Sequence, residues 1–326
     1  MIVCRTSTMS QRCRRAGRVS LARARRGRVL GAGLIVLLGL ACLSFLDPGA
    51  IAQEAVGQHR WRMAMDSTVR TVDEQKAKAA KPGSDFKECV NGCPVMIVIP
   101  AGKFIMGSPE NESDRKASEG PAHEVTVAKP FAVSKFEVTF DDWDACVAAA
   151  ACPRVPDSWG RGEMPVINVS WSDAKQYVGW LSQLTGKEYR LLTETEWEYA
   201  ARAGANTPFS WGDDPGKGNA NCGECGSQWD GQQTAPVGSF KPNALGLYDM
   251  HGNVWEWVED SWHENYEGAP TDGSAWLRGG DPSYRVIRGG SWRNESELVR
   301  AAFRVRRNIN VRFDTLGFRV ARTIEP

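Results

Sequence analysis

The sequence is poor in the side chains that usually bind transition metals. It has four histidines, none of which forms an H-x-x-x-H pair, and no cysteine follows Cys225. Thiolate and imidazole are the common ligands of copper, zinc and non-haem iron. The C-terminal part of the chain therefore offers no thiolate metal site. We expect the four histidines to be structural or solvated; they are His59, His123, His251 and His263.

Long apolar runs are scarce as well, and the clearest one lies at residues 29–46. Residues 1–28 before it carry nine arginines and no acidic residue, and the A-x-A pattern Ala50-Ile51-Ala52 follows it. This order is typical of an export signal, although 18 apolar residues are also the lower limit of a membrane span. We therefore predict that residues 1–52 are a cleaved export signal or a signal anchor. The protein would then be periplasmic or extracellular, touching a membrane only through residues 29–46.

Beyond residue 52 the chain has no excess of basic residues. It holds 31 Lys and Arg (40 minus nine) against 38 Asp and Glu (39 minus Asp47), a net charge of −7. Such a domain is a poor nucleic-acid binder and a natural calcium binder. A group of arginines near the C-terminus could bind an anionic ligand, but we favour pairing with acidic loops. The group consists of Arg300, Arg304, Arg306, Arg307 and Arg312.

Six cysteines remain after residue 52, and they fall into three close pairs. An even number of cysteines in an exported chain favours disulfides. A zinc site formed by the first and third pairs, or a redox motif in Cys222-Gly-Glu-Cys225, would be alternatives. We predict local disulfides for all three pairs, which are Cys89 with Cys93, Cys146 with Cys152, and Cys222 with Cys225.

The region before the first cysteine pair differs from the rest of the chain. Residues 53–88 are polar and rich in Ala and Lys, so we predict a tether there, followed by one domain over residues 89–326. At the start of that domain, apolar runs predict strands at Val95–Ile99 and Lys103–Met106. The intervening Pro100-Ala101-Gly102 would let the two strands form a hairpin-like arrangement.

Three capping boxes predict helix starts at Thr139, Ser170 and Thr193. Each of these residues is followed three positions later by an acidic residue, and Gly186 marks the expected end of the second helix. The third helix begins with three alternating glutamates, which we interpret as complementing the helix dipole and forming a solvated face. They are Glu194, Glu196 and Glu198.

Residues 205–284 show few periodic patterns and are rich in Gly, Asn, Asp, Trp and Pro. A long loop-rich region buries too little apolar surface to order itself, and disulfides or bound metal ions usually supply the remainder. Within it, Gly246–Trp257 alternates Trp255, Glu256 and Trp257. On an extended segment this alternation would bury aromatic rings on one face and present oxygen ligands on the other.

Taken together, the motifs resemble the sulfatase-modifying factor, or formylglycine-generating enzyme, family. The resemblance covers about Met96 to Arg322. It implies a single α+β domain that is loop-rich, has little regular secondary structure, and has a core similar to C-type lectins. It rests on seven motifs in the family's order: Pro100–Ser108, Glu137–Thr139, Pro165–Trp171, Arg190–Ala200, Gly246–Trp257, Arg288–Trp292 and Gly317–Arg319.

The resemblance also implies two structural Ca²⁺ sites. Each would combine side-chain oxygens with backbone carbonyls, which are the ligands that Ca²⁺ prefers. One set falls on Asn221, Cys222, Asp230 and Gln232. The other falls on Asp249, Gly252, Val254 and Glu256, inside the aromatic stretch.

The family's oxidases convert a substrate cysteine to formylglycine with Cu(I) held by two cysteines, and this sequence departs from them there. The equivalent positions are Asn294 and about Val299, neither of which binds Cu(I), so copper is not expected. The sequence therefore predicts a non-oxidase member that binds a peptide or protein partner. The alternative is a divergent oxidoreductase that modifies a protein or a small molecule at another site. We expect the pocket to involve Ser291, Trp292, Asn294 and Arg304, although Ser291 lacks the His–acid pair of a hydrolase nucleophile.

Overall fold

The computed structural model describes residues 83–324. The predicted leader, His59 and all but the end of the predicted tether lie outside the described residues. Of the helices in the described part, none is long and apolar enough to cross a membrane.

One sheet consists of five antiparallel strands in the order β1-β2-β5-β11-β6. β2 lies inside this sheet, and all four of its residues are buried. The C-terminal β11 lies between β5 and β6 and joins these two strands into one sheet. The strands are β1 (Asp85–Phe86), β2 (Met96–Ile99), β5 (Phe131–Ser134), β6 (Tyr189–Leu191) and β11 (Val320–Thr323).

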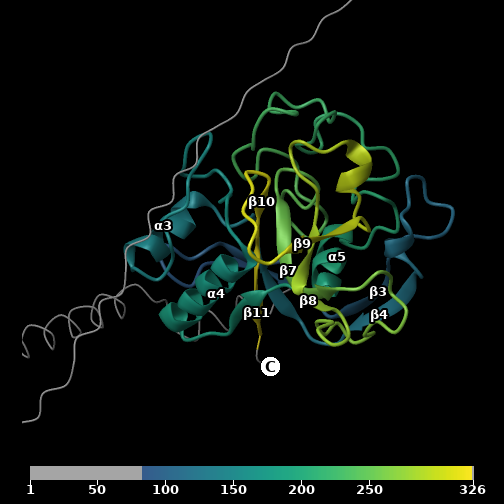
Figure 1. Cartoon of the computed structure of the whole chain (residues 1–326), viewed down its shortest axis with the longest axis horizontal. Helices are drawn as coiled ribbons and strands as arrows, with labels where there is room; N and C mark the ends of the chain where they lie inside the picture. The colour runs from purple at the N-terminus through teal and green to yellow at the C-terminus, as the bar shows by residue number, and fades with distance from the viewer. Residues whose placement is uncertain (1–82, 325–326) are drawn as a thin grey trace, which may run out of the picture. The chain divides into compact units, whose positions relative to one another are not determined.

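A second sheet of four strands has the order β10-β7-β8-β9, with β10 parallel to β7 and the other pairs antiparallel. Figure 1 shows β7, β8 and β9 near the centre of the domain, with the separate β3–β4 pair to one side. The strands are β7 (Trp255–Trp262), β8 (Asp281–Arg288), β9 (Arg304–Asn308), β10 (Leu316–Gly317), β3 (Gly102–Met106) and β4 (His123–Val127).

The three predicted helices are confirmed. They are α3 (Phe140–Ala148), α4 (Trp171–Thr185) and α5 (Glu194–Arg202). Thr139, Ser170 and Thr193 each form the predicted capping box, and Gly186 ends α4 in the left-handed conformation at φ 67°. Two short 3₁₀ turns, η1 (Ala117–Glu119) and η2 (Ser296–Val299), complete the elements.

The predicted hairpin between the first two long strands is wrong. β3 pairs with β4, whereas β2 pairs with β1 and β5. The reason is burial: β2 is apolar on both faces and uses both edges inside a sheet, but β3 alternates between exposed and less exposed side chains. A short connection permits a hairpin, but it does not require one.

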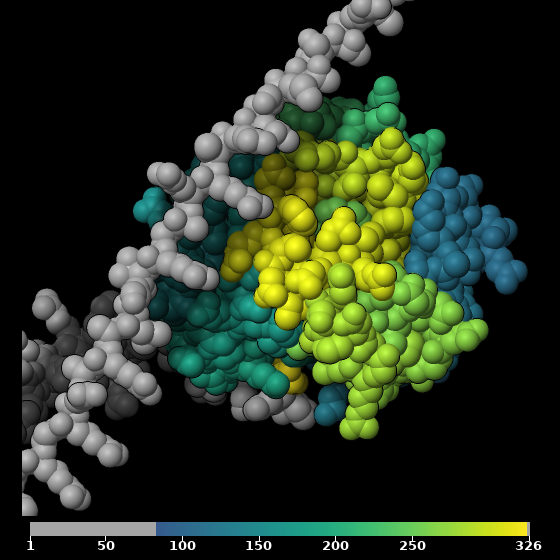
Figure 2. Space-filling view, in the orientation of Figure 1, coloured from purple at the N-terminus to yellow at the C-terminus, as the bar shows by residue number. Residues whose placement is uncertain are grey.

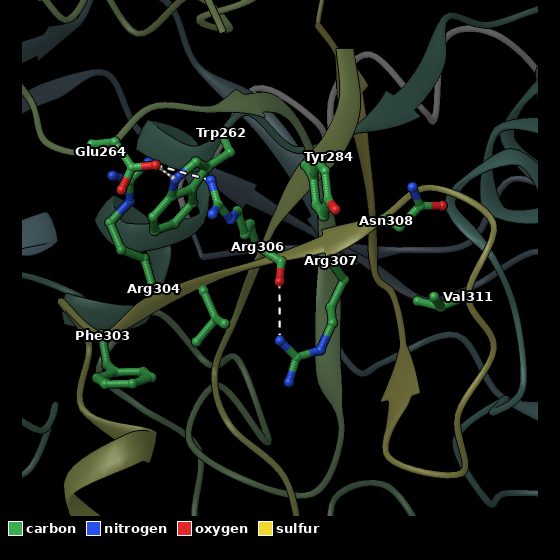
Figure 3. A pocket seen from close by; sticks show the side chains of 10 residues that line it. Trp262, Glu264, Tyr284, Phe303, Arg304, Arg306, Arg307, Asn308 and Val311 are labelled. Carbon is green, nitrogen blue, oxygen red and sulfur yellow. Dashed lines mark hydrogen bonds and ion pairs between the residues drawn. The ribbon is translucent and has the colours of Figure 1, made fainter. Parts of the chain in front are cut away.

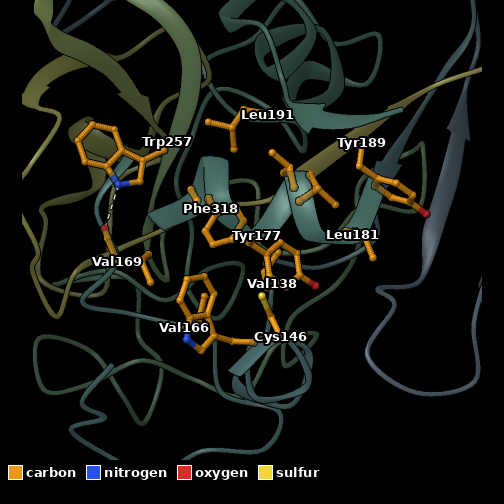
Figure 4. Packing of buried hydrophobic residues seen from close by; sticks show 14 of the residues in the cluster. Val138, Cys146, Val166, Val169, Tyr177, Leu181, Tyr189, Leu191, Trp257 and Phe318 are labelled. Atoms are coloured by element: carbon orange, nitrogen blue, oxygen red, sulfur yellow. Dashed lines mark hydrogen bonds between the residues drawn. The ribbon is translucent and has the colours of Figure 1, made fainter. Parts of the chain in front are cut away.

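The main core lies where α3 and α4 pack against both sheets. Trp143 stacks on Tyr177 at 5.8 Å between ring centroids, and Phe318 meets both rings edge-on. Figure 4 shows Tyr177 and Phe318 side by side in the middle of the cluster and Trp257 at its edge, where Trp257 Nε1 donates to the Val169 carbonyl at 3.1 Å. Because aromatic rings bury large areas with specific geometry, this cluster fixes the helices on the sheets.

The three glutamates of α5 are buried, so the predicted solvated face is wrong, but Glu194 and Glu196 lie in the first turn, where acidic side chains complement the helix dipole. Glu198 receives Arg288 Nη2 at 2.6 Å and Arg202 Nε at 2.8 Å. A buried carboxylate is tolerated when it is paired and hydrogen-bonded. Arg202 lies one turn further along α5, whereas Arg288 lies on β8. The pairing of Glu198 with Arg288 therefore could not be predicted from the sequence of α5 alone.

All three local disulfides are confirmed: Cys89–Cys93, Cys146–Cys152 and Cys222–Cys225. The loop-rich region predicted over residues 205–284 is confirmed up to β7, because no helix or strand lies between the end of α5 at Arg202 and the start of β7 at Trp255; β7 and the first residues of β8 lie inside the predicted range. Residues in this interval nevertheless reach zero exposure, among them Asn221, Cys222 and Ala235. The loops are therefore part of the interior.

Asp260 on β7 gives the fold a pH dependence. Its carboxylate accepts from the backbone N–H of Glu194 at 2.7 Å and of Trp276 at 2.7 Å. Burial, and then the charge of Glu194, raise the pKa of Asp260 to about 7. The native state thus holds a proton between about pH 4 and 7 that the unfolded chain has released, and stability falls as pH rises through that window.

We predict that Asp260→Asn flattens this slope. At about 1.4 kcal/mol per pKa unit, the native protein should lose about 4 kcal/mol of unfolding free energy from this group between pH 4 and 7. Urea unfolding at fixed calcium across this range measures it, with the exposed Asp213→Asn as the control. A slope that is unchanged in Asp260→Asn would contradict the assignment.

Candidate functional site

The turn after β8 holds three of the predicted pocket residues. Ser291 Oγ donates to Asn294 Oδ1 at 2.7 Å, and the backbone N–H of Ser291 donates to the same oxygen at 3.0 Å. Trp292 is buried, with its ring edge-on to Trp159 at 5.2 Å. Ser291 is only 1 % exposed, and its hydroxyl proton is already donated to Asn294. The three side chains thus form a packed turn.

Val299 is fully buried in a small cluster with Phe209, Ala220 and the Cys222–Cys225 disulfide. Gly290, at φ 75°, lies so close that a Cβ there would strike the Val299 side chain. An amide at Asn294 and an alkyl group at Val299 do not fit a Cu(I) site, because the soft ion needs thiolates. The sulfurs beside Val299 are joined in a disulfide and offer none.

His251 packs behind Val299. Its Nδ1 lies 2.7 Å from the Val299 carbonyl, and its Nε2 accepts from the Ser210 N–H at 3.3 Å. The ring meets Trp211 edge-on at 4.9 Å. Burial lowers the pKa of His251 to about 4, so the imidazole is neutral at ordinary pH. Both ring nitrogens are engaged, so this histidine is structural.

The predicted calcium ligands Asp249 and Glu256 differ in how well they are satisfied. Asp249 Oδ2 accepts from the Gly238 N–H at 2.7 Å, whereas its buried Oδ1 has no hydrogen-bond partner among the described residues. Glu256 accepts Arg319 Nε on both oxygens, at 2.9 and 2.7 Å, and Trp197 Nε1 at 2.7 Å. Asp249 therefore has free capacity for a cation, and Glu256 has less.

Glu137 is the residue of this region that the predicted ligand sets missed. Its Oε1 accepts from the Val254 N–H at 3.0 Å and its Oε2 from Asn253 Nδ2 at 2.6 Å. Burial, with the charges of Asp249 and Glu256, raises the pKa of Glu137 well above its ordinary value. The sequence did hold one signal for this residue, because Glu137 is the first residue of the family-like motif Glu137–Thr139.

Three buried carboxylates thus face one arginine. Burial raises the pKa of Asp249 to about 6, with the charge of Glu256 contributing. In the described part no three His, Cys, Asp or Glu side chains converge on one point to hold a metal. A cation here would need backbone carbonyls as well, which is the type of ligand that Gly252 and Val254 were predicted to supply.

The other predicted set adjoins this one. Asn221 forms a β-bridge with Gly252, and the Asn253 N–H donates to the Asn221 carbonyl at 2.8 Å. A Cβ at Gly252 would strike that carbonyl, so the close approach requires glycine. Asp230 Oδ2 accepts from the Gly226 N–H, and its buried Oδ1 has no partner among the described residues.

The residues of both sets fit a hard cation to this extent: each set keeps one buried carboxylate oxygen without a donor. Such an oxygen costs stability unless a proton, water or ion meets it. Asn221, Cys222 and Gln232 lie in the same loop as Asp230, with Asn221 Oδ1 accepting from Ser227 Oγ at 3.0 Å. Bound Ca²⁺ would supply the missing positive charge in both places.

Arg304, the fourth predicted pocket residue, lies apart from the Ser291 turn. It makes a bidentate pair with Glu194 at 2.7 and 2.9 Å. Its Nη1 donates to the carbonyls of Ser118 and His263. These contacts satisfy the buried guanidinium and leave it little capacity for an anion.

Pairing with acidic residues is confirmed for four of the five arginines. Arg300 meets Glu112 and Glu119, Arg304 meets Glu194, and Arg312 meets Asp173 at 2.8 Å. Arg306 has only the exposed Glu264, at 2.9 Å. Arg307 has no carboxylate within ion-pair distance in the described part of the chain.

A cleft of 660 Å³ follows β9 from end to end. Figure 3 shows Trp262 and Tyr284 on one side of the strand, Phe303 near its start and Val311 near its end. Its size lies in the range of ligand pockets. A smaller cleft of 320 Å³ shares Trp262, Glu264 and Arg306 with it. The lining residues are Trp262, Glu264, Tyr284, Phe303, Val311 and all five residues of β9.

The profile of the sulfatase-modifying factor enzyme 1-like domain matches residues 81–324. Mouse inactive C-alpha-formylglycine-generating enzyme 2 is 31% identical over 70% of this chain and 85% of its own length. The formylglycine-generating enzyme of Streptomyces coelicolor is 32% identical over 66% and 83%. The serine/threonine-protein kinase pkn1 of Chlamydia caviae is 30% identical over 78% of this chain, which spans only 41% of the kinase.

Among solved structures, PvdO from Pseudomonas aeruginosa is similar to this chain. The two are 43% identical with a TM-score of 0.69, and the match covers 75% of this chain and 99% of PvdO.

Proposed function

This chain belongs to the sulfatase-modifying factor enzyme 1-like domain family, and on that premise we propose that it is an exported, non-oxidase member. It binds a peptide or protein partner and folds around calcium. Relatives named as formylglycine-generating enzyme and as its inactive counterpart match about equally well. Overall similarity therefore does not decide between an oxidase and an inactive relative. That decision rests on the residues at the positions of the family's copper ligands.

The observation that carries the proposal is the chemistry at Asn294 and Val299. The Asn294 side chain accepts a hydrogen bond from the Ser291 hydroxyl, and Val299 is buried in an apolar cluster. No cysteine lies between Ser291 and Arg319 to replace them. Without thiolates there is no Cu(I) centre of the family's kind. What the chain retains is the fold and its surface clefts, which supports binding rather than oxidation.

We predict that the full chain does not convert a Cys-x-Pro-x-Arg peptide to the aldehyde. The peptide is incubated with the protein, oxygen and Cu(I), and mass spectrometry follows the loss of the thiol. The formylglycine-generating enzyme of Streptomyces coelicolor, run in parallel, is the positive control. Aldehyde formed by this chain above the protein-free level would contradict the non-oxidase proposal.

Calcium binding is supported by the two carboxylate oxygens without donors, Asp249 Oδ1 and Asp230 Oδ1. We assign the ligands to the two predicted sets, which adjoin through the Asn221–Gly252 bridge. Bound calcium would neutralise the surplus charge around Arg319 and order the loops between α5 and β7.

We predict that chelation of calcium lowers the melting temperature. Free calcium at 100 times its dissociation constant stabilises by about 2.7 kcal/mol, equivalent to about 5–10 °C for a domain of this size. Asp249→Asn and Asp230→Asn should each lose much of the calcium response in differential scanning fluorimetry. The exposed Asp213→Asn is the matched control. Equal calcium responses in all four proteins would contradict the assignment.

Export is supported by the three disulfides, because structural disulfides persist in oxidising compartments. We predict that expression in a Gram-negative host places the protein in the periplasm with its N-terminus near Gln53, or in the membrane fraction if the leader is retained. Cell fractionation with N-terminal sequencing measures this. Recovery of the full-length chain in the cytoplasm with free thiols would contradict it.

A further inference from the structure

The outer edge of β9 is open. β9 is the last strand in the order β10-β7-β8-β9, and no described strand pairs with its other side. In the view of Figure 2, the C-terminal segment in yellow forms the exposed surface beside the yellow-green residues near 260–280. Open strand edges bind extended peptides through main-chain hydrogen bonds, and natural proteins usually block those edges that are not used.

The register shows which backbone groups face outward. Ile309 donates to the Ser283 carbonyl, and β9 pairs with β8 in the same register through Arg307–Arg285 and Val305–Ile287. Because bonded and non-bonded pairs alternate in an antiparallel ladder, Arg304, Arg306 and Asn308 direct their N–H and C=O groups away from β8. Among the described residues, the Arg306 carbonyl accepts only from Arg307 Nη1, at 3.0 Å, as Figure 3 shows, whereas the Asn308 carbonyl accepts from the Val311 N–H at 3.1 Å.

The 660 Å³ cleft coincides with this edge. All five residues of β9 line it, so side chains from both faces of the strand border the same space. Arg306 and Asn308 lie on the face of Tyr284, whereas Val305 and Arg307 lie on the other with Phe303. A strand added here would present alternate side chains to these two walls. One wall carries the rings of Tyr284 and Trp262 with Arg306 lying over them, and the other carries Arg307 beside Val305 and Phe303.

Charge selects the occupant. Beyond residue 52 the chain carries a net charge of −7, yet the charged side chains of β9 that reach solvent are those of the exposed Arg306 and the half-buried Arg307. Arg307 has no carboxylate partner in the described part. Arg306 pairs with Glu264, but the Glu264 side chain is 78% exposed, so this ion pair is weak. Guanidinium groups bind carboxylates through two parallel hydrogen bonds. The edge is therefore complementary to an acidic segment.

We infer that the β9 edge binds an extended acidic segment of a partner protein by strand addition, with its carboxylates on the Arg307 wall and its alternate, apolar side chains on the wall of Tyr284 and Trp262. This deepens the proposed function, on which it rests, by naming the surface and the chemistry of the partner. Arg307 swings off the Arg306 carbonyl to pair with a ligand carboxylate. The freed carbonyl and the outward N–H groups then bond the ligand backbone.

The test is fluorescence anisotropy of the full chain with a labelled octapeptide of alternating Glu and Val. A Lys-Val octapeptide and an alternately N-methylated Glu-Val octapeptide serve as comparison ligands. We expect the Glu-Val peptide to bind and the other two to bind at least tenfold more weakly, because N-methylation removes the backbone donors but keeps the side chains. Equal binding of the N-methylated peptide would overturn strand addition.

Two arginine variants locate the site. Arg307→Gln should weaken binding about tenfold, the effect of losing one charge-assisted hydrogen-bonding group. Arg293→Gln is the matched control, since Arg293 is exposed and lies over Trp292, away from the cleft. Thermal unfolding confirms that both variants are folded. Loss of binding in Arg293→Gln alone would place the peptide at the Ser291 turn, overturning this inference while leaving the proposed function standing.

Two further outcomes overturn the inference. If none of the peptides binds, the inferred site on β9 is wrong. The non-oxidase proposal is tested separately, and only aldehyde formation in the oxidase assay would contradict it. Sedimentation that shows a dimer which Arg306→Pro dissociates would assign the edge to a second copy of this chain. In the inferred case the protein stays monomeric without peptide, and Arg306→Pro abolishes peptide binding by removing an outward N–H donor.

Discussion

The structure depends on one buried ion pair, between Arg319 and Glu256. Arg319 Nε lies 2.7 Å from Glu256 Oε2, and both side chains are at most 1% exposed. The same guanidinium donates to the Ser134 carbonyl on β5 and to the Tyr248 carbonyl. It therefore joins the five-stranded sheet to β7 and to the loop before it. A buried pair is stable only when its remaining hydrogen bonds are satisfied, and here four separate segments meet in order to satisfy them.

The pair also explains why the loop-rich half is ordered and what it requires. Arg319 balances one of three nearby carboxylates, while Glu137 and Asp249 remain within the same charge field. Burying them ionised is costly without a further positive charge. Protonation or a cation can supply it, and the predicted calcium ligands lie beside these groups. Order in the loops between α5 and β7 is thus tied to charge balance as well as to the apolar side chains that these loops bury, among them Phe209, Leu247 and Met250.

The sequence predicted what is local and missed what joins distant segments. Capping boxes and close cysteine pairs involve residues at most six positions apart, so Thr139, Ser170, Thr193 and the three disulfides could be read directly. The burial of Glu194 and Glu198 depends on Arg304 and Arg288, about 90 to 110 residues away. The role of Glu137 and the open edge of β9 depend on sheet order, which no local pattern encodes.

The same logic limits how this chain can be related to the family's oxidases. Asn294 and Val299, which the resemblance equates with the family's copper ligands, each use the side chain structurally. Asn294 Oδ1 accepts from the N–H and the hydroxyl of Ser291, and the Val299 side chain packs in the buried cluster with the Cys222–Cys225 disulfide. Two thiols placed there would lose these contacts, and the apolar surroundings of Val299 offer little of the polarity that supports a copper centre. The loss of oxidase residues is therefore built into the packing, and the surfaces that remain free to act are the clefts.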